Sequence, residues 1–225
     1  MKQPHLKSFN PVQEFKENID KTHVFIHGLE STIAATEVVL DFTKARNSPD
    51  YGKYKHLLEF DDIKISYLYE LGFISLFSNF EFFMFDFLKK LFLKYPTSIN
   101  NEKNICLEEI VDFKNVKDVK EYFADIIAIE KSYDIKSWVD FLGKKFNIKV
   151  FKTKKQLQRF LMLNALRNLY MHSGGITNAK FRREMKSFIK IRVPLGQKLG
   201  FDRRRYFEIL YHELCCIVME LALYV

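Results

Sequence analysis

LGFISLFSNFEFFMFDFL, residues 71–88, is the most apolar stretch of the chain, and it decides the fold class. Glu81 and Asp86 interrupt this stretch, and Lys89 and Lys90 follow it directly. A membrane span needs ~20 mostly apolar residues, and a central acid is costly there. The pattern therefore favours a buried amphipathic helix, and we expect no membrane partner.

The helix that contains this stretch is predicted to run over residues 61–95. The Asp61-Asp62 pair is suited to cap its start, and Pro96 lies just beyond its end. Residues 11–46 also carry apolar side chains at helical spacing and predict one long helix or two short ones. Turn-forming residues then break the pattern at 47–52. Two long helices joined by a short loop form an antiparallel hairpin, which is the usual seed of a helical bundle.

The rest of the chain is predicted to be mostly helical. Residues 97–118 are polar, and we expect a loop there that carries a short helix around 107–113. With only 8 Gly and 5 Pro in 225 residues, the composition favours long helices over a turn-rich β-sandwich. The sequence therefore predicts an all-α fold with at most one small β-hairpin. The remaining predicted elements are helices at 119–132, 136–146, 153–172 and 203–224, an extended piece at 149–151 and a hairpin at 188–201.

Charge and cysteine content narrow the choice of partners and compartment. The net charge of +8 and the pI near 9.2 favour polyanionic partners such as RNA, DNA or acidic lipid, although the same charge also serves solubility. Cys106, Cys215 and Cys216 show no metal-binding or disulfide spacing, so we expect reduced thiols. The first fifteen residues contain no apolar run typical of a signal peptide. A cytoplasmic protein is expected.

The polar side chains best suited to catalysis lie on the predicted helix at 153–172, TKKQLQRFLMLNALRNLYMH. Successive residues turn by ~100° around a helix, so the side chains divide into two faces. Asn168 and His172 are one turn apart and lie on the same face, and the long side chain of Arg167 can reach it. The face expected to meet the core comprises Met162, Ala165, Leu166 and Leu169. The opposite face comprises Asn164, Arg167, Asn168, Met171 and His172.

This polar face also has a purely structural interpretation. A cation at a helix C-terminus is favoured by the helix dipole, so His172 needs no further role. Gly174 and Gly175 are typical of residues that end a helix. In this interpretation Arg167 is an ordinary surface residue.

The stretch RNLYMHSGG, residues 167–175, resembles the HEPN superfamily motif, in which an arginine and a polar residue are followed at short distance by a histidine. The segment Asn79-Phe80-Glu81 is similar to the "FE" helix that precedes the motif in several such families. The resemblance covers residues 61–225. Two segments carry no resemblance to the family: an N-terminal helical extension at 1–60 and a helical insert at 97–150. The resemblance implies a single HEPN-like domain over the whole chain, a helical bundle with a long helical hairpin.

The resemblance also implies an activity. HEPN nucleases cleave RNA without a metal, using the Arg and His of two protomers that meet at a dimer interface. Here the motif assigns catalytic roles to Arg167 and His172, with Asn168 orienting the imidazole or a phosphate oxygen. An imidazole can serve as base or acid near pH 7, and a guanidinium can hold the scissile phosphate. We therefore expect a homodimer with no cofactor. The apolar residues expected at its interface are Leu157, Phe160 and Leu161.

Basic clusters flank the motif at Lys152–Lys155, Arg182-Arg183 and Arg203–Arg205. Together they predict a track that contacts RNA phosphates, or else ordinary solvated helix faces. The residues we expect to contact RNA are Asn164, Lys154, Lys155, Arg182 and Arg183.

Three further groups are weaker candidates. Glu81 is either a carboxylate that supports the motif or, as we favour, a buried ion-pair partner. Gly174 and Gly175 are expected to support the motif by ending its helix. His23 and His27 are four residues apart, but the sequence shows no third ligand, so we predict no metal site.

The sequence thus favours a metal-independent endoribonuclease that serves as a toxin or an antiphage defence effector, with an antitoxin or another protein as a possible partner. The alternative is a non-catalytic HEPN module that binds a nucleotide, RNA or a protein and regulates it. No phosphate-binding loop, zinc motif or nucleophile elbow is present to support a kinase, P-loop or hydrolase function.

Overall fold

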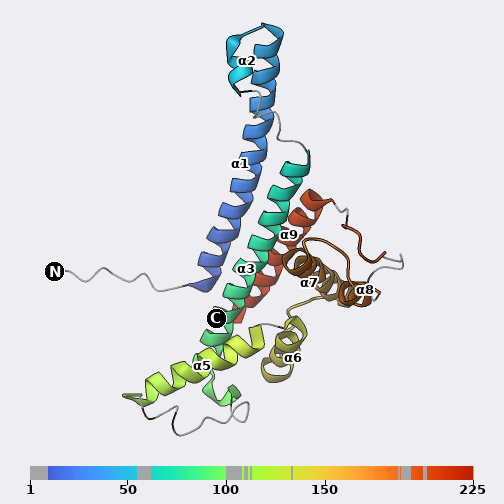
Figure 1. The fold of residues 1–225 in the computed structure, drawn as a ribbon. Coiled ribbons are helices and arrows are strands. Elements are labelled where there is room, and N and C mark those ends of the chain that lie inside the picture. Colours follow the sequence, from blue (N-terminus) through green and yellow to red (C-terminus); the bar gives the residue numbers. More distant parts are fainter. Residues whose placement is uncertain are drawn as a thin grey trace, which may run out of the picture. The chain divides into compact units, whose positions relative to one another are not determined.

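The computed structural model describes residues 10–54, 62–99, 108, 111, 113–132, 134–186, 188, 194–199 and 202–224. Every regular element in these residues is helical, and the β pairing found among them is an isolated bridge between Ile176 and Lys198. The predicted all-α fold is therefore confirmed (Figure 1). In chain order the elements are α1 (Pro11–Ala45), α2 (Pro49–Tyr54), α3 (Asp62–Lys94), η2 (Pro96–Ile99), α5 (Val116–Ser132), α6 (Ile135–Phe146), α7 (Lys154–Ser173), α8 (Ala179–Met185), α9 (Arg203–Leu221) and η3 (Ala222–Tyr224).

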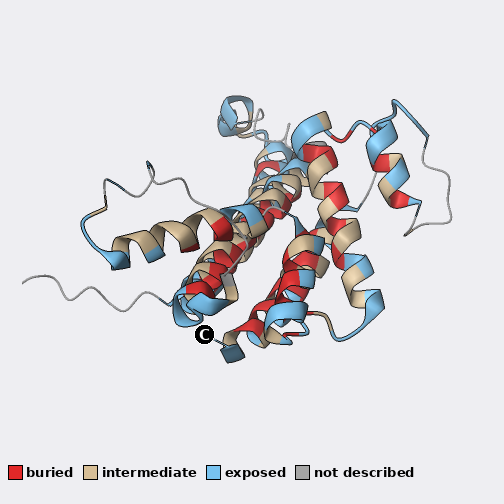
Figure 2. Ribbon diagram, turned by 90° about the horizontal axis from the view of Figure 1, so that it is seen from below, coloured by how far each residue is buried: buried red, intermediate tan, exposed pale blue. Residues whose placement is uncertain are grey.

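Two compact units share these helices. Unit 1 is formed by the described parts of 1–16, 78–161 and 213–225, and unit 2 by those of 17–77 and 162–212. The helices α1, α3, α7 and α9 each contribute one part to unit 1 and another part to unit 2. Along the helices, buried residues follow one side and exposed residues the other (Figure 2).

Unit 1 has an aromatic core around Phe80 of α3. The Phe80 ring centroid lies 5.4 Å from that of Phe160 on α7, 6.1 Å from Trp138 on α6 and 6.2 Å from Phe15 on α1. All four side chains are buried. Edge-on contacts between such rings add to the stability gained from burying them. The beginning of α1, the end of α3, α6 and the beginning of α7 are thereby held together.

Unit 2 is built where α1, α3 and α9 lie side by side (Figure 1). Gly72 permits this close packing. A Cβ at this position would lie 2.8 Å from the Phe207 ring and 2.9 Å from Ile26, distances too short for any real side chain. Tyr69 on the same face of α3 packs edge-on against Phe207 at 5.5 Å. The absence of a side chain at Gly72 therefore sets the spacing of three helices.

The helix ends follow from local sequence. Asp134 accepts a hydrogen bond from Ser137 N at 2.9 Å, and Asn178 accepts one from Phe181 N at 2.9 Å, so both act as N-caps. Asn147 ends α6 with a φ of 54°, a left-handed conformation that asparagine tolerates. Asn47, just after α1, also has a positive φ, of 50°. The predicted break after residue 46 is therefore present.

One local prediction needs correction. Residues 49–54 form the short helix α2 rather than a continued break, and Gly52 lies inside it. The described part of the predicted hairpin at 188–201 pairs with the segment after α7. Thr177 N donates to Gln197 O at 2.9 Å, and Gly196 N donates to Thr177 O at 2.8 Å. The buried Thr177 hydroxyl also donates to Pro194 O at 2.6 Å, which favours this pairing.

Some predicted features lie outside the described residues. These are most of the short helix expected at 107–113, the remainder of the predicted hairpin, and Cys106. Among the described residues, neither Cys215 nor Cys216 forms a disulfide bond.

Among the described helices, α3 is long and apolar enough to cross a membrane over Ile65–Lys94. Half of its most apolar window is buried inside the protein. A core helix of a bundle has the same properties, so length and composition alone do not indicate a membrane span.

We predict that Asp86→Asn stabilises the protein at neutral pH. Asp86 lies half-buried on α3, and burial, followed by the nearby charge of Glu14, raises the pKa of its carboxyl group. The native state therefore holds this proton more tightly than the unfolded state. The stability of the wild type should fall as the pH rises from the ordinary Asp pKa through the raised one.

Thermal unfolding at about pH 7 and about pH 3 measures this effect. The variant should melt above the wild type at the higher pH, and the difference should vanish at the lower one. Asp140→Asn, at an exposed position of α6, is the matched control. A variant that melts below the wild type at neutral pH would show that the ionised Asp86 is stabilising.

Candidate functional site

The last two turns of α7 present the polar residues of the motif. Arg167 and Asn168 are half-buried, and His172 is exposed in the last turn. Leu166, Leu169 and Tyr170 of the same turns are buried. The expected division into a core face and a polar face is therefore present in these turns. Met162 of the predicted core face is only half-buried, and the buried Leu163 and Tyr170 were not predicted as core residues.

The side chain of Arg167 contacts two residues of unit 2, the unit to which it belongs. Its guanidinium carbon lies 5.4 Å from the centre of the Phe77 ring on α3, and its Nη1 donates to Met171 Sδ at 3.6 Å. A guanidinium over an aromatic face gains a cation–π attraction. Arg167 and His172 are five residues apart, so their side chains leave the helix ~140° apart. In one protomer, therefore, this helix alone does not aim both groups at one point.

Gly174 and Gly175 end α7 as predicted, with φ of 54° and 79°. Gly174 N donates to Tyr170 O at 3.2 Å, and Gly175 N donates to Leu169 O at 3.3 Å. These bonds satisfy carbonyl groups of the last turn. The Tyr170 hydroxyl donates to Leu199 O at 3.1 Å, which ties the helix end to the following segment.

The predicted RNA contacts are distributed over several elements. Lys154 and Lys155 are exposed in the first turn of α7 and belong to unit 1. Arg182 and Arg183 lie on α8 in unit 2, half-buried and exposed respectively, and Asn164 is half-buried on α7.

Two members of the flanking basic clusters have acidic partners instead. Lys152 forms an ion pair with Glu220, which raises the pKa of its ammonium group. Arg204 Nη1 lies 3.3 Å from Glu30 Oε1. Part of the positive charge in these clusters is therefore already balanced within the chain.

One predicted role changes with the structure. Phe160, expected at a dimer interface, is fully buried in the core of unit 1, so that expectation is wrong. Leu157 and Leu161 are half-buried. Glu81 of α3 is half-buried and belongs to unit 1, whereas Arg167 and His172 belong to unit 2.

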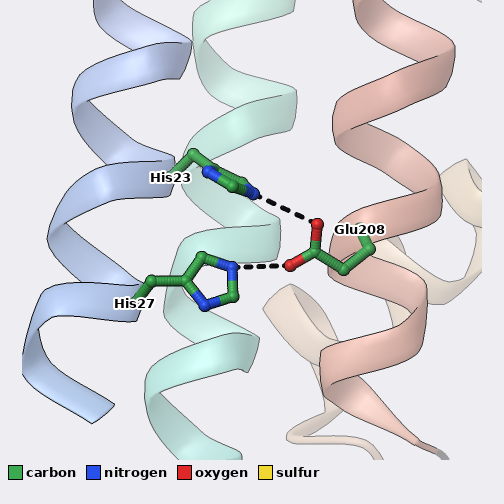
Figure 3. A group of neighbouring side chains, drawn as sticks. All are labelled: His23, His27 and Glu208. Atoms are coloured by element: carbon green, nitrogen blue, oxygen red, sulfur yellow. Dashed lines mark hydrogen bonds and ion pairs between the residues drawn. The ribbon is translucent and has the colours of Figure 1, made fainter. Parts of the chain in front are cut away.

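A second polar cluster lies in unit 2, where Glu208 of α9 reaches the two histidines of α1 (Figure 3). Glu208 Oε2 is 3.1 Å from His23 Nε2, and Oε1 is 2.6 Å from His27 Nε2. Burial alone would raise the pKa of Glu208, but the hydrogen bonds and charges of the two histidines outweigh it and hold the pKa below its ordinary value. These three residues could hold a metal ion.

The sequence pattern indicates the two histidines of this cluster but not Glu208. The His23–Glu208 contact spans 185 residues of sequence. No local spacing encodes it.

No family model, curated protein or solved structure matches this chain. The likeness to HEPN proteins therefore rests on the residues of the sequence motif alone.

The left-handed turn at the end of α7 leads to a testable prediction for Gly174 and Gly175. Alanine at position 174 or 175 must adopt a left-handed conformation, which costs ~1–2 kcal/mol. At position 175 the new Cβ would also lie 2.7 Å from Cε1 of Tyr170, whereas nothing lies within 4 Å at position 174. The Tyr170 ring is buried and bonded to Leu199, so it cannot easily move.

We therefore expect Gly174→Ala to lower the melting temperature by ~2–8 °C, and Gly175→Ala to lower it distinctly further. The two variants serve as controls for each other because both replace a left-handed glycine. Equal losses would mean that the Tyr170 contact does not constrain this turn.

Proposed function

We propose that this protein is a metal-independent HEPN-type endoribonuclease that acts as a homodimer. The observation that carries the proposal is the placement of Arg167, Asn168 and His172 at the C-terminal end of α7, opposite the buried Leu166 and Leu169. A role as a toxin or antiphage effector, restrained by an antitoxin-like protein, and a cytoplasmic location fit such an activity.

The proposed chemistry uses the substrate's own 2′-OH as nucleophile. One imidazole removes the 2′-OH proton while an imidazolium protonates the leaving 5′-oxygen, so the products are a 2′,3′-cyclic phosphate and a 5′-hydroxyl. His172 suits both roles because a neutral imidazole can accept a proton and a protonated imidazole can donate one. Arg167 offsets the charge that develops on the phosphate, and Asn168 orients an imidazole or a phosphate oxygen.

A dimer supplies what one protomer lacks. The base and the acid must act on opposite sides of the phosphate, and a two-fold axis brings two copies of His172 to one site. The apolar contacts now proposed for this interface are Met171 and Ile176, which are 47% and 51% exposed in the same unit as the motif. They replace the buried Phe160 in this role.

We predict that RNA cleavage persists in EDTA, and that His172→Ala lowers its rate by ~10²–10⁴-fold, the usual contribution of general acid–base catalysis. DNA should be spared because it has no 2′-OH. Arg167→Lys should also be impaired, since an ammonium keeps the charge but not the two parallel hydrogen bonds of a guanidinium.

Gel-resolved cleavage of a labelled RNA measures these rates, with His212→Ala as the control for an exposed histidine of unit 2. Sedimentation of the same samples gives the oligomeric state. Full activity in His172→Ala, a requirement for added Mg²⁺, or full activity in a sample that sediments as a monomer would each contradict the mechanism.

We also predict that RNA affinity falls steeply with salt, because bound Lys and Arg side chains release counterions from the phosphates. Replacing Lys154 and Lys155, or Arg182 and Arg183, by Gln should weaken binding and flatten the slope of log affinity against log salt. Each phosphate contact contributes roughly 0.7 to that slope for single strands. Exchanging Lys117 and Lys120 on α5 for Gln provides a charge-matched control. An unchanged slope in both test variants would show that these residues do not contact RNA.

A further inference from the structure

We propose that His23, His27 and Glu208 bind a divalent transition-metal ion of the zinc class, which links α1 to α9. This site is separate from the motif of α7, and the inference does not depend on the proposed ribonuclease activity. It rests on three features: the arrangement of the ligand atoms, the groups that orient the rings, and the chemistry of the donors.

The ligand atoms already lie close to a coordination geometry. The Nε2 atoms of both histidines face the Glu208 carboxylate at 3.1 and 2.6 Å, and one ligand atom from each of the three residues lies within 4.8 Å of the others (Figure 3). Ligands bound at ~2.0–2.2 Å to a tetrahedral ion are ~3.4 Å apart. Small rotations of these side chains would therefore make room for an ion between them.

The rings are held in this orientation from outside the cluster. His27 Nδ1 lies 3.7 Å from Glu30 Oε2 and 3.4 Å from the Tyr69 hydroxyl, which itself donates to Glu30 at 2.5 Å. A carboxylate behind a metal-bound imidazole is the usual partner that fixes its tautomer and orientation.

His23 is fixed by stacking. Its ring lies 4.3 Å from that of Tyr211 and 5.7 Å from that of Phe207. The Tyr211 hydroxyl donates to Asp20 at 2.7 Å, so the ring that covers His23 is itself anchored. Pre-oriented ligands lose little freedom when an ion binds.

The donor set selects the class of ion. Two imidazole nitrogens and one carboxylate oxygen suit zinc and similar transition metals, whereas Ca²⁺ and Mg²⁺ prefer oxygen ligands throughout. In the zinc-protease sequence H-E-x-x-H the first histidine is followed by a glutamate that serves as general base. Here that position is Val24, which is 70% exposed. A structural link between helices is therefore the role we assign to the ion.

Zinc binding by the full-length protein tests this site without reference to activity. We expect ZnCl₂ to raise the melting temperature saturably, titration to give one ion per chain, and EDTA to reverse the shift. Glu208→Gln should weaken binding by more than the ~10–100-fold typical of losing an outer partner, and Glu30→Gln by about that amount. His212→Ala, one turn from Glu208 and exposed, should bind zinc as the wild type does.

Co²⁺ binding to the wild-type protein provides a second measurement, which requires no variant to fold. Wild-type protein should develop the visible absorption of a four- or five-coordinate Co²⁺ site, and ZnCl₂ should abolish it. Wild type that shows neither a zinc-dependent shift nor a Co²⁺ spectrum would overturn the proposal and leave a metal-free His–Glu–His cluster. Equal zinc affinity in Glu208→Gln and wild type would also overturn it. Cleavage assays in EDTA should be run below the melting temperature of the metal-free protein, so that loss of this ion is not mistaken for loss of catalysis.

Discussion

The burial of the apolar side of α3 is the constraint on which the rest of the described structure depends. Its phenylalanines need partners on several sides, and each unit supplies them with helices that are distant in sequence. In unit 2 these are α1 and α9, which approach closely because Gly72 has no side chain. The same approach brings His23 and His27 of α1 within hydrogen-bond distance of Glu208. The metal site that we propose is thus a consequence of packing around α3.

The motif helix depends on the same constraint in a different way. Phe77 of α3 offers a ring face to Arg167, so the guanidinium is positioned by a core residue and not only by its own helix. The left-handed turn at Gly174 and Gly175 ends α7 immediately after His172 and leaves the imidazole exposed. Proposed catalysis and proposed metal binding therefore use opposite kinds of site. One is an exposed helix end that a partner completes, and the other is a half-buried cluster that one chain completes alone.

Sequence reasoning succeeded where the signal is local. The expected bounds 11–46 and 61–95 differ by only a residue or so from Pro11–Ala45 and Asp62–Lys94, because helical periodicity and end residues specify them. It failed where tertiary packing decides. Phe160 lies on the polar side of α7 by helical arithmetic, yet it is buried, because the first part of α7 belongs to unit 1 and its second part to unit 2. A single buried face assigned from helical periodicity therefore does not hold for both parts of α7. Glu208 was missed for a related reason, since only the folded chain brings it to His27, 181 residues away.

The central claim, that the end of α7 cleaves RNA through the substrate's 2′-OH, is tested most directly with a modified substrate. A labelled oligoribonucleotide is first cut to map the scissile bonds, and a copy is then made with a single 2′-deoxy nucleotide on the 5′ side of one of them. If the 2′-OH is the nucleophile, cleavage stops at that bond and continues at the others. Undiminished cleavage at the modified bond would contradict this mechanism, because water or a protein group would then have to be the nucleophile.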